Sequence, residues 1–177
     1  IGILYCDTGS ENPFGAKMAL ETLRGVEDEA RELGIPVSAH VVQPNLERRL
    51  MVRIAGRGYP PPNTFFRWCT KDIRVRPVAT FLESLSSNNN AVVLGVRRDE
   101  SQQRKRSLAV TRGGYWSEQR EGVTKLPLFM PIIDLTVQDV WDGLDTVPGP
   151  SAMHKEKLWD LYKDASAECP VIKTPDD

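Results

Sequence analysis

Two polar segments follow apolar runs of the sequence, and their residue types suit the binding of a nucleotide. The first segment offers a carboxylate, two hydroxyls and a flexible backbone, in Asp7, Thr8, Gly9 and Ser10. Such groups can hold the ribose or the base edge of a nucleoside. The alternative interpretation is that Asp7 and Ser10 only cap the helix that follows.

The second polar segment, residues 95–101, starts at Gly95 and brings two guanidinium groups and a hydroxyl together, in Arg97, Arg98 and Ser101. Arginine recognises phosphate through a planar fork of donors. Because ligands of open α/β sheets bind at the carboxyl ends of the strands, the two segments together predict a nucleotide site. Two solvated arginines are the alternative interpretation of the same residues.

Two of the three cysteines are candidates for thiol or metal chemistry. Cys69 lies where a loop enters a helix, among basic residues, and a positive setting favours the thiolate that attacks sulfur or binds metal. Cys169 lies in an irregular segment near the end of the chain, whereas Cys6 belongs to an apolar strand and is most simply a core residue. Unreactive thiols are the alternative for the two candidates. Two cysteines alone do not supply the four ligands of an iron–sulfur cluster.

The net charge of −1 conceals a strongly basic middle of the chain. Residues 45–125 carry 16 basic and 7 acidic side chains, while both flanking regions are net acidic. The basic residues of the middle include Arg48, Arg49, Arg53, Arg57, Arg67, Lys71, Arg74, Arg76, Arg104, Lys105, Arg106 and Arg112. Tyr59, Phe65, Phe66 and Trp68 fall among them, a mixture typical of surfaces that neutralise phosphates and stack on bases. The pattern favours nucleic-acid binding over a solvated face that neutralises a single nucleotide.

The elements that must position these residues predict an α/β fold. An apolar strand at 1–6, a helix from Asn12-Pro13 to Gly34 and a β-branched strand at 36–42 form a βαβ unit, which favours a parallel sheet. Further on, the sequence predicts helices over 45–54, 75–85, 137–144 and 155–165, a strand at 91–95 and a short extended piece at 131–133. Thr136 and Asp139 resemble a capping box before the third of these helices.

Length and composition exclude several classes of protein. The 177 residues are enough for one domain with a core that buries roughly 70% of the unfolded surface. Collagen-like, disordered and disulfide-framework chains are excluded, and no apolar run approaches the roughly 18 residues of a membrane helix. Unpaired cysteines without a visible export signal predict a cytoplasmic location. Because the chain opens inside an apolar run, we expect it to be an interior stretch of a longer protein.

Four segments in order resemble the phosphoadenylyl-sulfate reductase-like branch of the ATP pyrophosphatase (PP-loop) superfamily. They are residues 5–9 (YCDTG), 67–70 (RWCT), 95–101 (GVRRDES) and 131–141 (PIIDLTVQDVW). Within that branch, residues 56–61 (GRGYPP) and 158–170 (LWDLYKDASAECP) are most similar to DndC-type proteins of bacterial DNA phosphorothioation, including the related SspD type.

The resemblance implies an adenine nucleotide alpha hydrolase-like, three-layer fold with a mostly parallel sheet. Residues 1–144 correspond to the α/β domain, and residues 145–177 to a C-terminal extension that leads into an iron–sulfur cysteine segment. The family's first strand and its Ser-Gly-Gly-x-Asp-Ser phosphate loop are missing, and Arg74 stands where many relatives have lysine. We therefore expect this segment alone to be inactive.

The resemblance also implies an activity, in which ATP with Mg²⁺ adenylates a DNA phosphate, pyrophosphate leaves, and sulfur replaces a non-bridging oxygen. A cysteine desulfurase would supply the sulfur, with other phosphorothioation proteins as partners. A 4Fe–4S cluster would count Cys69 and Cys169 among its ligands. ATP would be held by Asp7, Thr8, Gly9, Gly95 and Ser101, with Arg97 and Arg98 as catalytic residues, and DNA by Arg67, Lys71, Arg74, Arg76, Arg104, Lys105 and Arg106. The alternatives are a phosphoadenylyl- or adenylyl-sulfate reductase and a non-catalytic, nucleotide-gated DNA-binding subunit.

Overall fold

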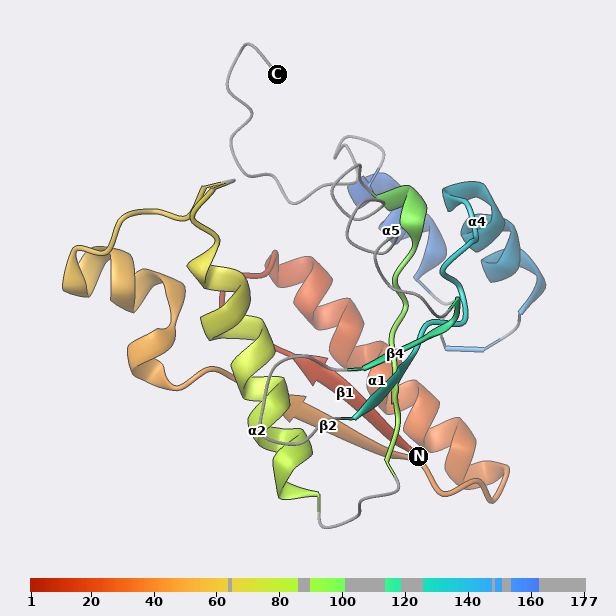
Figure 1. Cartoon of the computed structure of the whole chain (residues 1–177). Coiled ribbons are helices and arrows are strands. Elements are labelled where there is room, and N and C mark those ends of the chain that lie inside the picture. Colours follow the sequence, from red (N-terminus) through yellow and green to blue (C-terminus); the bar gives the residue numbers. More distant parts are fainter. Residues whose placement is uncertain are drawn as a thin grey trace.

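A computed structural model describes residues 1–63, 65–85, 90–100, 114–118, 126–147, 149–150 and 154–162 of the chain. The strands are β1 (Gly2–Cys6), β2 (Ser38–Val42), β3 (Val92–Val93), β4 (Trp116–Glu118) and β5 (Pro127–Phe129). The α-helices are α1 (Pro13–Glu32), α2 (Arg76–Ser84), α4 (Val137–Thr146) and α5 (Lys155–Tyr162) (Figure 1). Short 3₁₀ turns form η1 (Leu46–Arg48) and η4 (Arg98–Glu100), and π-helical turns form η2 (Val52–Gly56) and η3 (Thr70–Val75).

Helix α1 begins and ends where the sequence predicts. The Asn12 side chain accepts a hydrogen bond from the backbone N of Phe14 at 2.9 Å, and Pro13 occupies the first turn. Gly34 ends the helix with a φ of 68°, a left-handed conformation that costs glycine little, and the N of Ile35 then donates to the carbonyl of Ala30 at 2.8 Å. The expected helix between Asn12 and Gly34 is therefore confirmed.

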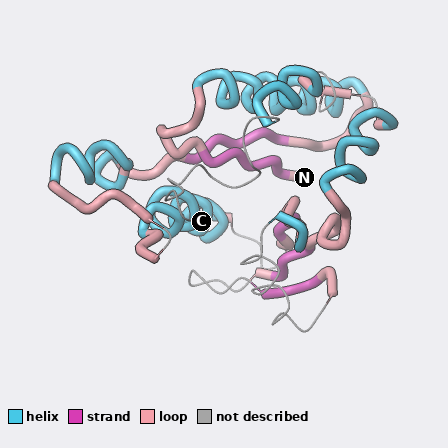
Figure 2. Tube along the Cα trace, turned by 90° about the horizontal axis from the view of Figure 1, so that it is seen from above, coloured by secondary structure: helices cyan, strands magenta, loops and turns pink. Residues whose placement is uncertain are grey.

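Strands β1 and β2 form a parallel pair between two helices. Their register runs from Gly2 opposite Ser38 to Cys6 opposite Val42, which confirms the predicted βαβ unit. Helix α1 covers one face, where the N of Ala39 donates to Glu27 Oε1 at 3.3 Å. Helix α2 covers the other face, where the rings of Phe81 and His40 lie 4.9 Å apart. The three layers are seen one above another in Figure 2.

A second, separate sheet has the strand order β3-β5-β4. Strand β3 runs parallel to β5, and β4 runs antiparallel to it. The described strands therefore form two small sheets rather than the one mostly parallel sheet expected. The extended piece predicted at 131–133 is wrong, because the N of Ile133 bonds to the carbonyl of Met130 and closes a turn with Pro131 at its second position. The strand lies earlier in the same apolar run, at β5.

The segments on either side of the Cys69 motif contain 3₁₀ and π-helical turns in place of the regular helices expected. The helix predicted over 45–54 is divided into η1 and η2, and the helix predicted over 75–85 begins earlier because η3 runs directly into α2. Thr136 and Asp139 form the expected capping box at the start of α4, and this helix continues to Thr146 rather than ending at residue 144. No helix in the described ranges is long and apolar enough to cross a membrane.

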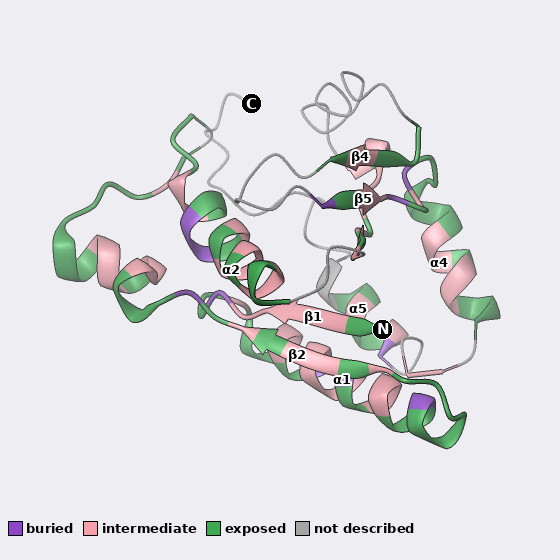
Figure 3. Cartoon of the chain, turned by 60° about the horizontal axis from the view of Figure 1, so that its bottom comes forward, coloured by how far each residue is buried: buried purple, intermediate pink, exposed green. Residues whose placement is uncertain are grey.

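The C-terminal part of the described chain packs against α1. His154 is buried, and its Nε2 lies 3.3 Å from Glu21 Oε2 without a hydrogen bond. Gly25 faces Pro150 in the same region. The buried apolar side chains fall into two groups, one in α1 and η3 and one beside β5 (Figure 3): Met18, Leu23, Ala30 and Ile73, then Leu126, Met130 and Ile133.

The contact between α1 and Pro150 predicts that replacing Gly25 with alanine destabilises the protein, unlike most glycine-to-alanine changes in helices. A helical Gly→Ala change normally stabilises by about 1 kcal/mol, and we expect this for Gly143→Ala, where no neighbouring atom lies within 4 Å of the new Cβ. At Gly25 the new Cβ would lie 2.8 Å from Pro150 Cβ, so residues 149–150 must move away. Since overpacking costs about 1–3 kcal/mol, Gly25→Ala should lower the free energy of unfolding by about 1 kcal/mol. Urea unfolding measures both variants, and equal stabilisation would contradict the contact.

Candidate nucleotide site at the strand ends

The loop after β1 is held by its own side chains. Asp7 Oδ1 accepts a hydrogen bond from the N of Gly9 at 2.9 Å, and Gly9 adopts a φ of 73°. Thr8 is buried, and its hydroxyl donates to Glu11 Oε1 at 2.6 Å. The alternative that Asp7 and Ser10 cap α1 is wrong, because Asn12 is the cap. The loop is thus a fixed platform at the carboxyl end of a parallel strand.

The residues after β2 are connected to this loop by two consecutive side-chain hydrogen bonds, which the sequence did not predict. Gln43 Nε2 donates to Asp7 Oδ2 at 2.7 Å, and Arg49 Nη2 donates to Gln43 Oε1 at 2.9 Å. The Arg49 Cδ lies 3.9 Å from the position that a Cβ on Gly9 would take, and the buried Arg49 Nε has no hydrogen-bond partner among the described residues. Arg49 therefore brings positive charge to the loop. No local motif marks it, because its place depends on the parallel pairing of β1 with β2.

The environment of this loop raises the pKa values of two side chains of β1, Tyr5 and Cys6. The pKa of Tyr5 is raised by burial and, to a smaller extent, by the negative charges of Glu11 and Asp7. The pKa of Cys6 is also raised, chiefly by burial, although the Arg74 charge opposes the shift. The Cys6 thiol donates to the carbonyls of Ile73 and Arg74 at 3.5 and 3.8 Å. Cys6 is therefore held in the protonated, unreactive form.

In the segment after β3, the two arginines predicted to act together, Arg97 and Arg98, have different surroundings. Arg98 forms an ion pair with Asp134, and its backbone N donates to the carbonyl of Ile133. The N of Arg97 donates to Glu100 Oε1 at 3.1 Å, but the buried Arg97 Nη1 has no hydrogen-bond partner among the described residues. A buried, charged N–H without a partner is costly, so Arg97 is suited to an anionic group such as phosphate. Gly95 leads into this segment, and its Cβ position lies 3.8 Å from Ile132 Cδ1.

The two halves of the predicted site lie at the ends of different sheets. Asp7, Thr8 and Gly9 are brought together with Arg49, while Gly95, Arg97 and Arg98 are grouped around β5 and the turn after it. Within the ranges that the structure describes, no hydrogen bond or ion pair joins the two groups. Five predicted site residues lie outside the described residues: Ser101, Arg104, Lys105, Arg106 and Cys169.

A buried carboxylate, Asp72, organises the basic middle of the chain, and no pattern in the sequence predicted it. Asp72 Oδ1 lies 3.0 Å from Nη1 of both Arg48 and Arg76, and its Oδ2 lies 2.6 Å from Arg53 Nη1. The Asp72 side chain is only 10% exposed. The one available signal was an acidic residue standing alone among the basic residues of 67–76.

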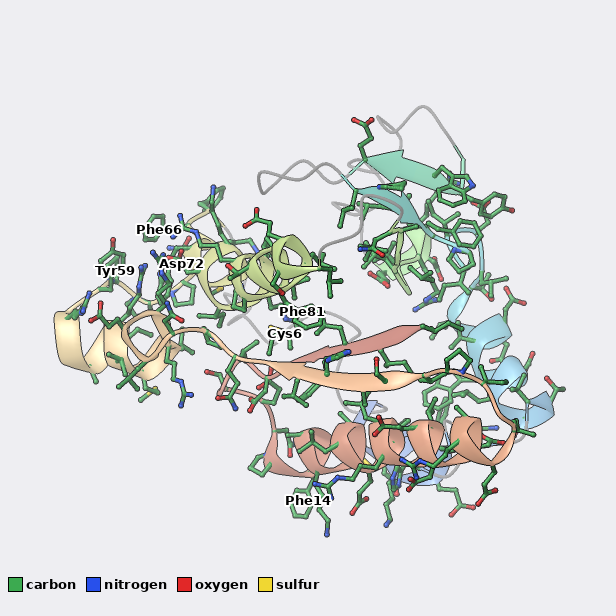
Figure 4. All side chains as sticks on the ribbon, turned by 90° about the horizontal axis from the view of Figure 1, so that it is seen from below. Cys6, Phe14, Tyr59, Phe66, Asp72 and Phe81 are labelled. Atoms are coloured by element: carbon green, nitrogen blue, oxygen red, sulfur yellow. The ribbon has the colours of Figure 1, made fainter. Side chains whose placement is uncertain are left out.

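Arg53 in turn holds the loop that precedes Cys69. Its guanidinium lies 4.9 Å from the ring centre of Tyr59 and 5.1 Å from that of Trp68, both within cation–π range. Trp68 Nε1 donates to the carbonyl of Pro60 at 3.1 Å, which closes the loop. Figure 4 shows Tyr59, Phe66 and Asp72 on the same side of the molecule. Asp72 with Arg48, Arg53 and Arg76, here called the Asp72 cluster, thus holds Trp68, the residue next to Cys69.

The described residues do not supply the ligands of an iron–sulfur cluster. Cys69 and Cys6 are both free, and Cys6 is turned toward η3. No group of three or more histidine, cysteine or acidic side chains suited to a metal ion occurs in the described ranges.

The layered βαβ unit, with polar loops at the carboxyl ends of its parallel strands, defines an α/β domain of the type that binds ligands at strand ends. Residues 3–148 match the phosphoadenosine phosphosulfate reductase domain, and the chain belongs to that family. The predicted superfamily branch is confirmed, while the DndC type stays a prediction.

A similarity to a longer archaeal protein extends over much of the chain. The chain is 26% identical over 136 residues to the uncharacterised protein MJ0066 of Methanocaldococcus jannaschii. The match covers 73% of this chain and 23% of that protein, so the chain spans about a quarter of its relative's length.

Proposed function

We propose that this domain binds ATP with Mg²⁺ and takes part in the transfer of sulfur to the DNA backbone. Membership of the phosphoadenosine phosphosulfate reductase family supports a nucleotide-dependent, sulfur-related activity. The observation that carries the proposal is the buried, unpartnered Nη1 of Arg97 at the end of a parallel strand. Asp7, Thr8 and Gly9 would hold the adenosine, with Arg49 adding positive charge beside them.

In the proposed reaction, an oxygen of the DNA phosphodiester attacks the α-phosphorus of ATP and pyrophosphate leaves. A sulfur nucleophile at the oxidation level of hydrosulfide then attacks the DNA phosphorus, and AMP leaves with the activated oxygen. Arg97 neutralises negative charge on the transferring phosphoryl group, and Arg98, fixed by Asp134, adds to the local field. A cysteine desulfurase and other phosphorothioation proteins are the proposed partners. Cys69 and Cys169 would take part in binding an iron–sulfur cluster.

The proposed DNA surface lies around η3. Arg67, Lys71 and Arg74 are exposed there, and the neighbouring Phe65 and Phe66 are exposed too, as expected of rings that meet unstacked bases. Arg76 belongs to the Asp72 cluster and would contribute from its edge. Arg104, Lys105 and Arg106 are proposed to extend this surface.

The role of Arg97 can be tested in the complete protein with labelled ATP and DNA. We expect Arg97→Ala to lower pyrophosphate release by about 100-fold, as for the loss of one preorganised donor to a developing charge. Arg98→Ala should have a smaller effect, because that guanidinium is already paired with Asp134. Arg31→Ala, which removes the same charge from the outer side of α1, is the matched control. Unchanged pyrophosphate release by Arg97→Ala would refute the assignment.

The second candidate function is reduction of a small sulfonucleotide, which the description of the matched family favours. The same preparation distinguishes the two activities when it is given phosphoadenylyl sulfate with thioredoxin. Production of sulfite without sulfur incorporation into DNA would establish the reductase instead.

A further inference from the structure

A pocket of about 490 Å³ lies beside the Asp72 cluster, on the side of β2 covered by α2. We call it the Asp72 pocket, and the residues that matter for its chemistry are Arg48, Asp72, Arg76, Thr80, Phe81 and Ser84. Its volume falls within the range of about 300–1,000 Å³ that is typical of sites for small organic ligands. Gln43 also lines it, so the pocket adjoins the Asp7 loop without including it.

The charge of the pocket favours an anion. Asp72 holds the guanidiniums of Arg48 and Arg76 on the same oxygen, so two positive charges and one negative charge line the pocket. Arg53 does not line the pocket but binds the other oxygen of Asp72 and so neutralises its charge further. Among the described residues, Asp72 is the only carboxylate partner of Arg48 and Arg76. Their side chains are 38% and 45% exposed, which leaves further N–H donors within reach of a ligand. Two arginine forks held side by side suit a phosphate group.

The rest of the pocket suits a flat ring with polar edges. Phe81 lines the wall and is held by its contact with the ring of His40, and Figure 4 shows it on the sheet side of α2. An aromatic wall of this kind stacks on a base regardless of its sequence. Ser84 Oγ donates to the carbonyl of Phe81 at 2.6 Å, so its oxygen remains an acceptor for an amino group. The Thr80 hydroxyl lies one turn before it on the same lining.

We propose that the Asp72 pocket binds one nucleotide unit, with its phosphate on Arg48 and Arg76 and its base against Phe81. The site is distinct from the Asp7 loop, and the inference does not depend on the proposed sulfur transfer. The phosphate ester could come from a free mononucleotide or from one unit of a single strand of nucleic acid. Both sources present the same chemistry to the pocket.

The experiment titrates the folded chain calorimetrically with 5′-AMP, with a 12-nucleotide single strand of DNA and with inorganic phosphate, at low salt. We expect AMP or the strand to bind, and Arg48→Gln to weaken that binding about tenfold, as for the loss of one charge-assisted hydrogen-bonding group. Phe81→Leu should weaken it severalfold through the loss of stacking. Arg31→Gln, on the opposite layer, is the matched control and should leave the affinity unchanged. Binding of AMP identifies a free nucleotide as a sufficient ligand, and binding of the strand alone identifies nucleic acid as the source.

Folding and site identity are checked separately. Arg48→Lys keeps the charge beside Asp72 but removes the planar fork, so it should stay folded by circular dichroism and still bind more weakly than the parent chain. If Thr8→Val abolishes AMP binding while Arg48→Gln does not, the nucleotide occupies the Asp7 loop and the proposal is overturned. The same conclusion follows if none of the three probes binds at millimolar concentration, if inorganic phosphate alone binds, or if Arg31→Gln weakens binding as much as Arg48→Gln.

Discussion

Replacing Asp72 with asparagine lowers the free energy of unfolding by about 3 kcal/mol, the expected cost of removing one partner from a buried ion pair. The substitution leaves the nearly buried Arg53, whose side chain is 15% exposed, without its carboxylate. It also leaves Arg48 and Arg76 close together without the charge that holds them. The cost stays at the lower end of the usual range because these two arginines are partly exposed and water can solvate them. Chemical denaturation followed by circular dichroism measures the change.

The matched control for Asp72→Asn is Asp28→Asn on α1. Asp28 pairs with Arg31, but both side chains are more than 60% exposed, so we expect a change of less than about 0.5 kcal/mol. The loop before Cys69 provides a second readout, because Trp68 packs against Arg53 and its fluorescence should change in Asp72→Asn alone. Similar losses of stability in the two variants would show that Asp72 does not organise the basic middle of the chain.

Ile133→Ala should destabilise the protein by about 3 kcal/mol, within the usual range for truncating a buried isoleucine. Ile133 is the most deeply buried side chain of the described residues, at 1% exposure. Its carbonyl also accepts the backbone N of Arg98 at 2.9 Å. Truncation therefore leaves a cavity under the segment that carries Arg97, and nucleotide affinity should fall together with stability.

The control for Ile133→Ala is the same substitution at Ile35, whose side chain is 45% exposed just after α1. We expect a loss of less than about 1 kcal/mol there, because little apolar surface leaves a buried environment. Thermal unfolding compares the two variants directly. A larger effect at Ile35 than at Ile133 would contradict the placement of the core beside β5.

The first half of the fold was predictable because its signals are local. Asn12-Pro13 and Gly34 mark the ends of α1, the apolar spacing defines its inner face, and short connections then require β1 and β2 to run parallel. The position of β5 was not predictable in this way. Residues 126–133 form a nearly continuous apolar run, so the alternation that would locate a strand is absent, and Pro131 was the sole sign of the turn.

The candidate site was predictable only in its local parts. The Asp7 loop and the Arg97 segment follow strands directly, so sequence alone located them. Arg49 and Asp72 depend on contacts between distant segments. Two of the three partners of Asp72 lie far before it, Arg48 by 24 residues and Arg53 by 19, and no spacing rule joins their turns to a later helix start. Arg76 stands four residues after Asp72, a helical spacing, but the sequence predicted the helix to begin only at residue 75. Asp134 pairs with Arg98 and not with Arg97, and this difference also depends on a contact between distant segments.

The two sheets differ in the number of residue pairs that hold their parallel strands together. Gly2 pairs with Ser38 and Val92 with Leu128, a separation of 36 residues in each case, so the entropy of loop closure is about the same for both. Five register pairs between β1 and β2 offset the entropy lost in the first closure, whereas two pairs between β3 and β5 offset the entropy lost in the second. Because only two register pairs hold β3 to β5, we expect local opening of the native state to begin at β3, on the side that carries Arg97. An anion bound by Arg97 would stabilise the closed state and oppose that opening. Hydrogen exchange of the backbone amides in this segment should therefore become slower as the site is filled.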